Sequence, residues 1–314
     1  MSKNFSVASL FAGIGGIDLA FHKAGFEIFW ANEIDKKACD TYSENFSQKI
    51  ICEDIKKLKP SKLDSVDVIA GGFPCQAFSV AGLRRGLEDI RGTLIFDLLK
   101  IAKELEPKVI FLENVKNLKS HNEGKTFSYI VDSIKKLGYQ IKFQIINTAE
   151  YSQIPQNRER IYMACFKDEK TFNAFSFPGK ISKTFEIVDL LEDKVDDCFY
   201  YNRTKYYPLL KKEIRNKSTC YQWRRKYVRE NKSNLCPTLT ANMGTGGHNV
   251  PLILDNKGIR KLTPRECARF QGFPENFKFP KSHPNSAIYK QVGNSVSVPV
   301  VERIAKNIFN AMCV

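Results

Sequence analysis

The chain has 314 residues, a formal net charge of +15 at pH 7 and a sequence pI near 9.3. Its apolar share is typical of a soluble globular protein, and this length allows one large core or two domains that fold without covalent staples. The excess of Lys and Arg favours a polyanionic partner such as nucleic acid, although a well-solvated basic surface would give the same charge.

Nine cysteines and four histidines are scattered along the sequence without any CxxC pair. This spacing matches neither a zinc cage nor the signature of the base deaminases, so we expect a protein of the reducing cytoplasm with no metal. The apolar N-terminal stretch SVASLFAGIGGIDLAF contains Asp18 and follows no basic region. We therefore expect no signal peptide and no membrane span.

Short β-rich runs alternate with helical patterns from Ser6 to about Lys167, which predicts an α/β fold with a mostly parallel sheet covered by helices. The predicted strands are Val7–Phe11, Glu27–Ala31, Val66–Ala70, Val109–Leu112, Gln140–Asn147 and Ile161–Phe166. The predicted helices include Gly16–Ala24, Lys36–Phe46, Thr93–Leu105 and Phe127–Leu137.

The alternation stops after Phe166, and a second, smaller domain is predicted to begin near Lys180. Its segment Arg203–Lys232 mixes basic and aromatic residues, a composition that suits phosphates and bases. A solvated basic face whose aromatic side chains pack inward is the less favoured alternative. The glycines of Cys236–Ile253 indicate either a close backbone approach or an ordinary hairpin loop. The amphipathic C-terminal helix is expected to return to the first domain.

Gly13, Gly15 and Gly16 lie between the first predicted strand and helix, where backbone amides can meet a polar cofactor. Asp18 occupies the last glycine position of a GxGxxG pattern, which disfavours a dinucleotide with a pyrophosphate. Glu33, about twenty residues further on, ends the second strand, where a carboxylate can accept hydrogen bonds from ribose hydroxyls. A nucleoside without a diphosphate indicates S-adenosylmethionine, and a surface or helix-capping acid is the alternative for Glu33.

Cys75 follows Gly71, Gly72 and Pro74 directly after a predicted buried strand, and Glu113 of FLENVKNL follows another. The carboxyl ends of parallel strands form one rim, so the glycine turn, Glu33, Cys75 and Glu113 are expected to converge. Most single cysteines are buried and inert. A place in a loop after a strand favours a reactive thiol instead.

A thiol, a carboxyl group and a methyl donor together suit methylation of cytosine at carbon 5. Addition of a thiolate to carbon 6 makes carbon 5 nucleophilic, and an acid at N3 quenches the charge that develops on the ring. Arg158 and Arg160 of QNRERIY stand at alternate positions entering a strand, which predicts that they point to one side and favour the thiolate. Surface ion pairing with Glu159 is the alternative.

These motifs resemble the DNA (cytosine-5) methyltransferases of the compact bacterial restriction–modification type, in linear order over nearly the whole chain. The matching segments are FAGIGG, NEID, EDI, GGFPCQAFS, LENV, QNRERIY, RKLTPRECARFQGFP and YKQVGNSVSVPV. The resemblance implies a Rossmann-like S-adenosylmethionine-dependent domain at residues 1–180, completed by 286–314. It also implies a target-recognition domain and hinge at 181–285.

By the same resemblance Cys75 is the nucleophile, Glu113 the N3 partner, and Arg158 and Arg160 orient the base and the acid. The implied cofactor-binding residues are Phe11, Ala12, Gly13, Ile14, Gly15, Gly16, Glu33, Ile34, Asp54, Ile55, Phe73, Pro74, Leu94, Asn294, Ser295 and Val296. The implied DNA-binding residues are Gln76, Ser79, Arg91, Arg224, Arg225, Thr238 and Thr240. Ile34 stands where the family often has an aromatic residue, and EDI replaces the more usual GDI.

The implied function is methylation of a cytosine rotated out of double-stranded DNA, with S-adenosyl-L-methionine converted to S-adenosyl-L-homocysteine. A monomer and a short, roughly symmetric site are expected, and the sequence does not disclose whether a cognate restriction endonuclease exists. The tRNA-methylating branch of the family is one alternative, but it has a PPCQPF-like form where this chain has FPCQAFS. A catalytically silent DNA-binding regulator is the other, although such a protein would usually have lost Cys75 or Glu113.

Overall fold

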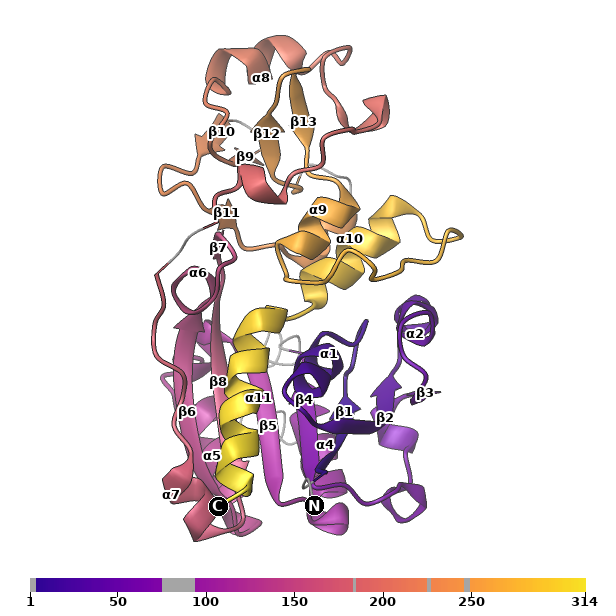
Figure 1. Cartoon of the computed structure of the whole chain (residues 1–314), viewed down its shortest axis with the longest axis vertical. Coiled ribbons are helices and arrows are strands. Elements are labelled where there is room, and N and C mark those ends of the chain that lie inside the picture. The colour runs from indigo at the N-terminus through magenta and orange to yellow at the C-terminus, as the bar shows by residue number, and fades with distance from the viewer. Residues whose placement is uncertain (1–3, 75–93, 183–184, 225–226, 246–248) are drawn as a thin grey trace. The chain divides into compact units, whose positions relative to one another are not determined.

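The computed structural model describes residues 4–74, 94–182, 185–224, 227–245 and 249–314 (Figure 1). The chain divides into two compact units. The first comprises the described residues up to Ile146, Glu159–Gly179 and Val300–Val314, and the second comprises Asn147–Arg158 and the described part of Lys180–Pro299. Residues 147–158 and 286–299, which the sequence assigned to the first domain, group with the second unit.

A seven-stranded sheet with the order β3-β2-β1-β4-β5-β8-β6 forms the first unit. Its strands are β1 (Ser6–Leu10), β2 (Glu27–Glu33), β3 (Lys49–Cys52), β4 (Val68–Gly72), β5 (Val109–Val115), β6 (Gln140–Asn147) and β8 (Glu159–Phe166). The five strands β1 to β5 pair in parallel, whereas β8 runs antiparallel to β5. The mixed, mostly parallel sheet predicted from the sequence is therefore confirmed, and β3 is an additional strand.

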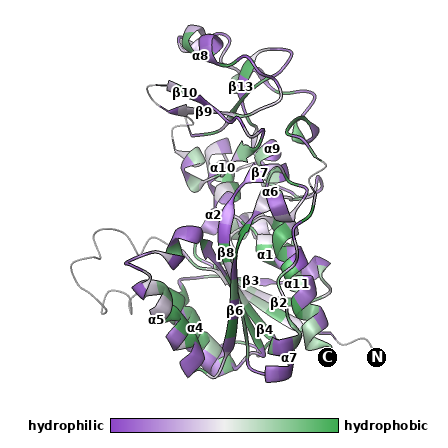
Figure 2. Ribbon diagram, turned by 90° about the vertical axis from the view of Figure 1, so that its left-hand side faces the viewer, coloured by the Kyte–Doolittle hydropathy of each residue, from purple (hydrophilic) through white to green (hydrophobic). Residues whose placement is uncertain are grey.

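Helices cover both faces of this sheet (Figures 1 and 2). They are α1 (Gly16–Lys23), α2 (Lys36–Ser43), α4 (Leu94–Leu105), α5 (Lys125–Lys136), α7 (Glu169–Ala174) and α11 (Val298–Met312), with short 3-10 turns at Ile55–Lys57, Pro60–Lys62 and Lys116–Lys119. One face carries α4 and α5, whose buried apolar residues form one core cluster with the strands, and the other carries α1 and α11. Thr93, the predicted start of α4, lies outside the described residues.

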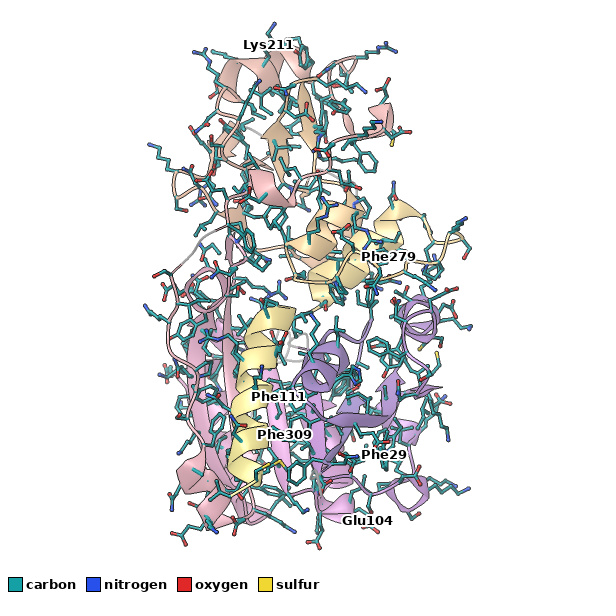
Figure 3. The ribbon with its side chains drawn as sticks, viewed as in Figure 1. Phe29, Glu104, Phe111, Lys211, Phe279 and Phe309 are labelled. Atoms are coloured by element: carbon teal, nitrogen blue, oxygen red, sulfur yellow. The ribbon has the colours of Figure 1, made fainter. Side chains whose placement is uncertain are left out.

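Aromatic contacts attach α11 to the first unit. Its Phe309, labelled in Figure 3, packs against Phe26 at 5.2 Å and Phe5 at 5.4 Å between ring centroids. Phe21 of α1 packs in the same unit against Phe111 of β5 at 5.3 Å. Burial of rings of this size is a large favourable term. The C-terminal helix thus returns to the first unit, as its amphipathic pattern predicted.

The second unit contains a four-stranded sheet with the order β10-β9-β12-β13 and a parallel pair β11-β7. The strands are β7 (Gln156–Asn157), β9 (Tyr221–Arg224), β10 (Tyr227–Glu230), β11 (Cys236–Pro237), β12 (Leu252–Leu254) and β13 (Ile259–Lys261). The helices are α6 (Thr148–Tyr151), α8 (Tyr207–Glu213), α9 (Pro264–Arg269) and α10 (Asn285–Asn294), with 3-10 turns at Val188–Leu190, Asp197–Phe199 and Ala241–Gly244. Within the described ranges, no helix is long and apolar enough to cross a membrane.

A buried ion network holds the segment TPRECARFQGFP in the second unit. Arg260 donates to both carboxylate oxygens of Glu266 at 2.7 Å and to Asp255 at 2.6 Å, and Arg260 and Glu266 are 0% exposed. Although burial opposes the charge, these carboxylates raise the pKa of Arg260 above its ordinary value. Thr263 and Glu266 also form a reciprocal capping box at the start of α9. Glu266 therefore both pairs with the charge of Arg260 and caps the start of α9.

Candidate active site

The site lies at the edge where the parallel strands end. The turn from Phe11 to Gly15 follows β1, Glu33 ends β2, and Glu113 lies near the end of β5. The register of β4 and β5 places Gly72 opposite Glu113. The structure thus brings the glycine turn, Glu33 and Glu113 to one edge of the sheet. Cys75 stands three positions after Gly72 and lies outside the described residues.

Left-handed backbone shapes the glycine turn. Phe11, Gly13 and Gly15 have φ values of 58°, 57° and 85°, of which only the glycines adopt such angles without a steric cost. A Cβ at Gly15 would lie 2.3 Å from the ring of Phe46, whereas a Cβ at Gly13 would meet no described atom within 4 Å. The turn therefore combines a closed side at Gly15 with open space at Gly13.

The carboxylate of Glu33 is fixed by three backbone amides. Oε2 accepts from the N–H of Gly13 at 2.8 Å, and Oε1 accepts from the N–H groups of Ile34 and Asp35 at 2.8 and 2.9 Å. An ionised carboxylate has about four acceptor positions, so Oε2 keeps one for a further donor. A half-buried carboxylate held in this way, beside the open space at Gly13, fits a ribose hydroxyl.

Asn32, which was not predicted as a site residue, orients the neighbouring loop. Its Nδ2 donates to the carbonyls of Ile51 and Glu53, both at 2.8 Å, and the residue is 1% exposed. The next residue, Asp54, accepts from the N–H of Lys56 at 3.0 Å and caps a 3-10 turn. A buried amide must be hydrogen-bonded. The presence of the polar Asn32 within the apolar strand β2 could therefore have indicated, from the sequence alone, that this side chain holds a neighbouring segment.

Asp18 has a structural role in place of the missing glycine. It is 0% exposed, and Ser9 of β1 donates its hydroxyl to the carboxylate at 2.8 Å from either oxygen. Burial raises the pKa of Asp18 to about 6, although the hydrogen bond from Ser9 opposes the shift. The residue ties α1 to β1, and its protonation is coupled to stability.

Comparison of the wild-type protein with an Asp18→Asn variant should isolate the part of the pH dependence of stability that Asp18 causes. The folded-state pKa of about 6 exceeds the ordinary 3.8, so the carboxyl group stabilises the fold at low pH and this contribution is lost as pH rises through 6. The free energy of unfolding of wild type relative to the variant should fall by about 1 kcal/mol between pH 5 and 7, then stay level. Denaturant unfolding at each pH measures it, and a flat difference would contradict the assignment.

Glu113 pairs with Arg160 across β5 and β8. The distance from Arg160 Nε to Glu113 Oε1 is 3.2 Å, and the two side chains are 13% and 11% exposed. The two groups are close enough for an ion pair but are not aligned for a hydrogen bond, because Glu113 Oε1 has no hydrogen-bond partner among the described residues. Arg160 also donates to the carbonyl of Glu159 at 2.8 Å. A buried carboxyl group with an unused oxygen and an adjacent cation suits proton sharing with a ligand.

Asn114 holds the chain that leads into the segment with Cys75. Its Nδ2 donates to the carbonyl of Phe73 at 2.9 Å, its Oδ1 accepts from the N–H of Val115 at 2.8 Å, and it is 2% exposed. Phe73 itself is buried, and Pro74 follows it on the surface. Asn114 was not predicted as a site residue, although it stands between Glu113 and Val115 in the LENV motif.

Other predicted site residues belong to the second unit. Arg158 is 2% exposed and donates to the carbonyl of Leu239 at 2.7 Å and to that of Ser295. Asn294 ends α10, and Ser295 and Val296 follow it. Arg158 and Arg160 therefore belong to different units, and the carbonyls of Leu239 and Ser295 that accept from Arg158 lie in its own unit. In the first unit, Leu94 starts α4 and Ile55 starts a 3-10 turn.

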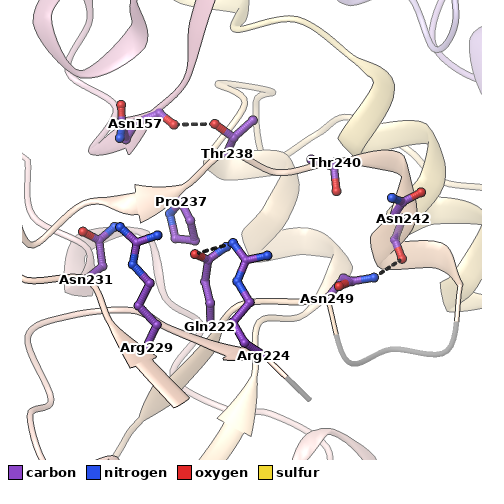
Figure 4. Close-up of a pocket in the computed structure, with 10 residues that line it drawn as sticks. All are labelled: Asn157, Gln222, Arg224, Arg229, Asn231, Pro237, Thr238, Thr240, Asn242 and Asn249. Carbon is purple, nitrogen blue, oxygen red and sulfur yellow. Dashed lines mark hydrogen bonds between the residues drawn. The ribbon is translucent and has the colours of Figure 1, made fainter. Parts of the chain in front are cut away.

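A polar pocket of about 410 Å³ lies within the second unit (Figure 4). Three residues predicted to bind DNA line it, namely Arg224, Thr238 and Thr240. Gln222 and Arg229 also line it and were not predicted. The rest of the lining is Asn157, Asn231, Pro237, Asn242 and Asn249. None of these residues is acidic, so the pocket suits an anionic or hydrogen-bonding ligand. Gln76, Ser79, Arg91 and Arg225 lie outside the described residues.

The described part of the chain contains no group of three or more His, Cys, Asp or Glu side chains placed to hold a metal ion. The seven-stranded, mostly parallel sheet of the first unit, with helices on both faces, is a Rossmann-like fold. Solved methyltransferases share it: that of Entamoeba histolytica (EhMeth) has a TM-score of 0.78 at 18% identity, covering 99% of both chains. A DNMT2 variant of Spodoptera frugiperda has a TM-score of 0.76 at 20% identity, covering 97% of this chain and 99% of its own.

The sequence profile of C-5 cytosine-specific DNA methylases matches residues 5–310, and the chain belongs to this family. It is 53% identical over 312 residues to the Type II methyltransferase M.Bsp6I of Bacillus sp. (strain RFL6), covering 98% of this chain and 99% of the relative. It is 38% identical to M.HhaI of Haemophilus parahaemolyticus, covering 96% and 94%. The chain is therefore a DNA cytosine-5 methyltransferase, as the order of its motifs predicted.

Proposed function

We propose that this enzyme is the modification methyltransferase of a Type II restriction–modification system. It methylates one cytosine within a short double-stranded sequence and acts as a cytoplasmic monomer beside an endonuclease for the same site. Two relatives that match nearly the whole chain are Type II methyltransferases by name, which supports this role. The observation that carries the chemistry is the buried pair of Glu113 and Arg160 beside Gly72.

In the proposed reaction the target base leaves the helix, because carbon 6 is inaccessible within the stack. The Cys75 thiolate forms a bond to carbon 6, and the ring electrons move toward N3, where Glu113 shares a proton. Arg160, whose Nε lies 3.2 Å from Glu113 Oε1, keeps Glu113 oriented. S-adenosylmethionine, when bound, supplies the methyl group to carbon 5. Loss of the proton from carbon 5 to solvent then returns electrons to the ring, and the bond to Cys75 breaks.

The cofactor residues proposed here fit a nucleoside. Glu33 accepts from a ribose hydroxyl through the remaining position of Oε2, and the turn at Gly13 supplies the open space. Asp54 meets the adenine amino group, with Ile55 beside it. We propose that the other cofactor-binding residues implied by the family also line this site, including Asn294, Ser295 and Val296 of the second unit.

The proposed DNA contacts come from two parts of the chain. Gln76, Ser79 and Arg91 hold the opened duplex near the nucleophile. Arg224, Thr238 and Thr240 belong to the polar pocket of the second unit, which we propose to be the target-recognition domain. The net charge of +15 supplies the general attraction to phosphates.

Bisulfite sequencing tests this function directly. A mixed-sequence plasmid is incubated with S-adenosylmethionine and either the wild-type protein or its Cys75→Ala variant. We expect protected cytosines at one recurring short motif with wild type and none with the variant, because the variant lacks the nucleophile. Equal protection by both proteins would contradict the role of Cys75. Methylation of tRNA but not of the plasmid would contradict the DNA substrate.

A further inference from the structure

The hairpin of β9 and β10 has two chemically different faces. Its register pairs Gln222 with Arg229 and Trp223 with Val228. Trp223 and Val228 pack on the apolar core of the second unit. Because side chains alternate along a strand, Gln222, Arg224 and Arg229 share the opposite face, where all three line the polar pocket. The core packing therefore fixes which side chains the hairpin presents to the pocket.

The two arginines of this face differ from Arg260 and Arg269 of the same unit. Arg260 and Arg269 are paired with carboxylates, whereas no carboxylate in the described part of the chain forms an ion pair with Arg224 or Arg229. Their surroundings are amides, hydroxyls and a proline. A guanidinium group without a carboxylate partner keeps its fork of N–H donors for a ligand with two adjacent acceptors.

Gln222 orients one of these guanidinium groups. Its Oε1 accepts from Arg224 Nη2 at 3.2 Å (Figure 4). Gln222 and Arg224 are two positions apart on one strand, so the contact lies along the face of the hairpin. A side chain that only neutralises phosphates needs no such partner, whereas bidentate reading of a base edge requires a fixed plane.

We propose that Arg224 and Arg229 each read a guanine of the target sequence through the O6 and N7 atoms in the major groove, and that Gln222 is the positioning residue for Arg224. This rests on the proposed DNA-methylating function. A two-stranded ribbon is narrow enough to enter the major groove, and an arginine fork on guanine is the commonest specific contact there. The target site then contains at least two guanines whose recognition depends on this hairpin.

The experiment is methylation of a DNA library randomised around the wild-type motif, read by bisulfite sequencing. Arg224→Ala and Arg229→Ala should each lose about 10- to 100-fold of discrimination at one guanine, and at different positions. Gln222→Ala should weaken discrimination at the same position as Arg224→Ala, a coincidence that a merely structural role would not produce. Arg203→Ala, a basic residue of the same unit outside the pocket lining, should keep the full motif and serves as the matched control.

Arg224→Lys keeps the charge and a long side chain but lacks the planar fork. A change of motif in this conservative variant therefore cannot be attributed to loss of folding. We expect it to relax the same guanine position. An unchanged motif in Arg224→Lys, together with a uniform loss of rate over all sequences in Arg224→Ala, would assign this side chain to a phosphate and overturn the inference. A wild-type protein that methylates no DNA would instead overturn the proposed function itself, so the two failures are distinguishable.

Discussion

Replacing Glu113 by glutamine should lower the rate of methyl transfer by about 10²- to 10⁴-fold, the range in which a positioned acid contributes. The amide keeps the size of the side chain beside Arg160 but cannot share its proton with N3 of the base. Binding of DNA and S-adenosylmethionine should remain near wild type, because Glu113 is proposed to act on the base during the reaction. Single-turnover transfer of a labelled methyl group to a duplex with the wild-type motif measures the rate.

Glu123→Gln is the matched control for this change. Glu123 lies in the same unit, its side chain is 83% exposed, and its ion pair with Lys125 is at the surface. The control should transfer methyl groups at the wild-type rate. A Glu113→Gln enzyme within threefold of wild type would remove Glu113 from the reaction, and equal losses in both variants would indicate a general effect of charge.

Replacing Arg260 by methionine should destabilise the second unit by about 3–5 kcal/mol, the typical cost of leaving a buried charge unpaired. Glu266 would keep its carboxylate at 0% exposure without the two hydrogen bonds from Arg260. Asp255 would lose its contact with Arg260 Nε as well. Methionine fills much of the same volume, so the loss reports on the charge and its hydrogen bonds more than on a cavity.

Fluorescence can follow the second unit alone in this experiment. The chain has two tryptophans, Trp30 in β2 of the first unit and Trp223 in β9 of the second. Urea unfolding in a Trp30→Phe background therefore reports through Trp223. Lys257→Ala, which removes an exposed ion pair with Asp197, should change the free energy of unfolding by less than about 1 kcal/mol. A similarly small change in Arg260→Met would refute the importance of the buried network.

Much of the first unit was predictable because its parallel strands are short apolar runs between clear helix patterns. β1, β2, β4 and β5 lie within a few residues of their predicted positions. β3 was not predicted, since KIIC is only four residues long and partly exposed. The second unit has short strands joined by long loops, and its topology depends on contacts such as β7 with β11 that link residues about 80 positions apart.

The site followed the same rule. Glu33 and Glu113 were predictable because each stands where a parallel strand ends, and strand ends share one edge. Asn114 acts on Phe73, 41 positions away, and no local pattern predicts that partner. Gln222 and Arg229 become visible as a pair only through the register of β9 with β10. The structure places Glu33 and Glu113 at these strand ends. The roles of all the predicted site residues, Cys75 and Arg158 included, stay predictions.

The path of the chain limits how the proposed target-recognition domain can be exchanged between relatives. A graft of residues 180–299 alone would leave Gln156 and Arg158 behind, although both belong to the second unit. Leu239 donates its N–H to Gln156, and its carbonyl accepts from Arg158. A chimera must therefore carry 147–158 from the same parent, or keep a backbone that these two side chains still fit. The proposed target-recognition domain is discontinuous in sequence, and a graft of its longer piece alone would lack the two side chains that hold the backbone of Leu239.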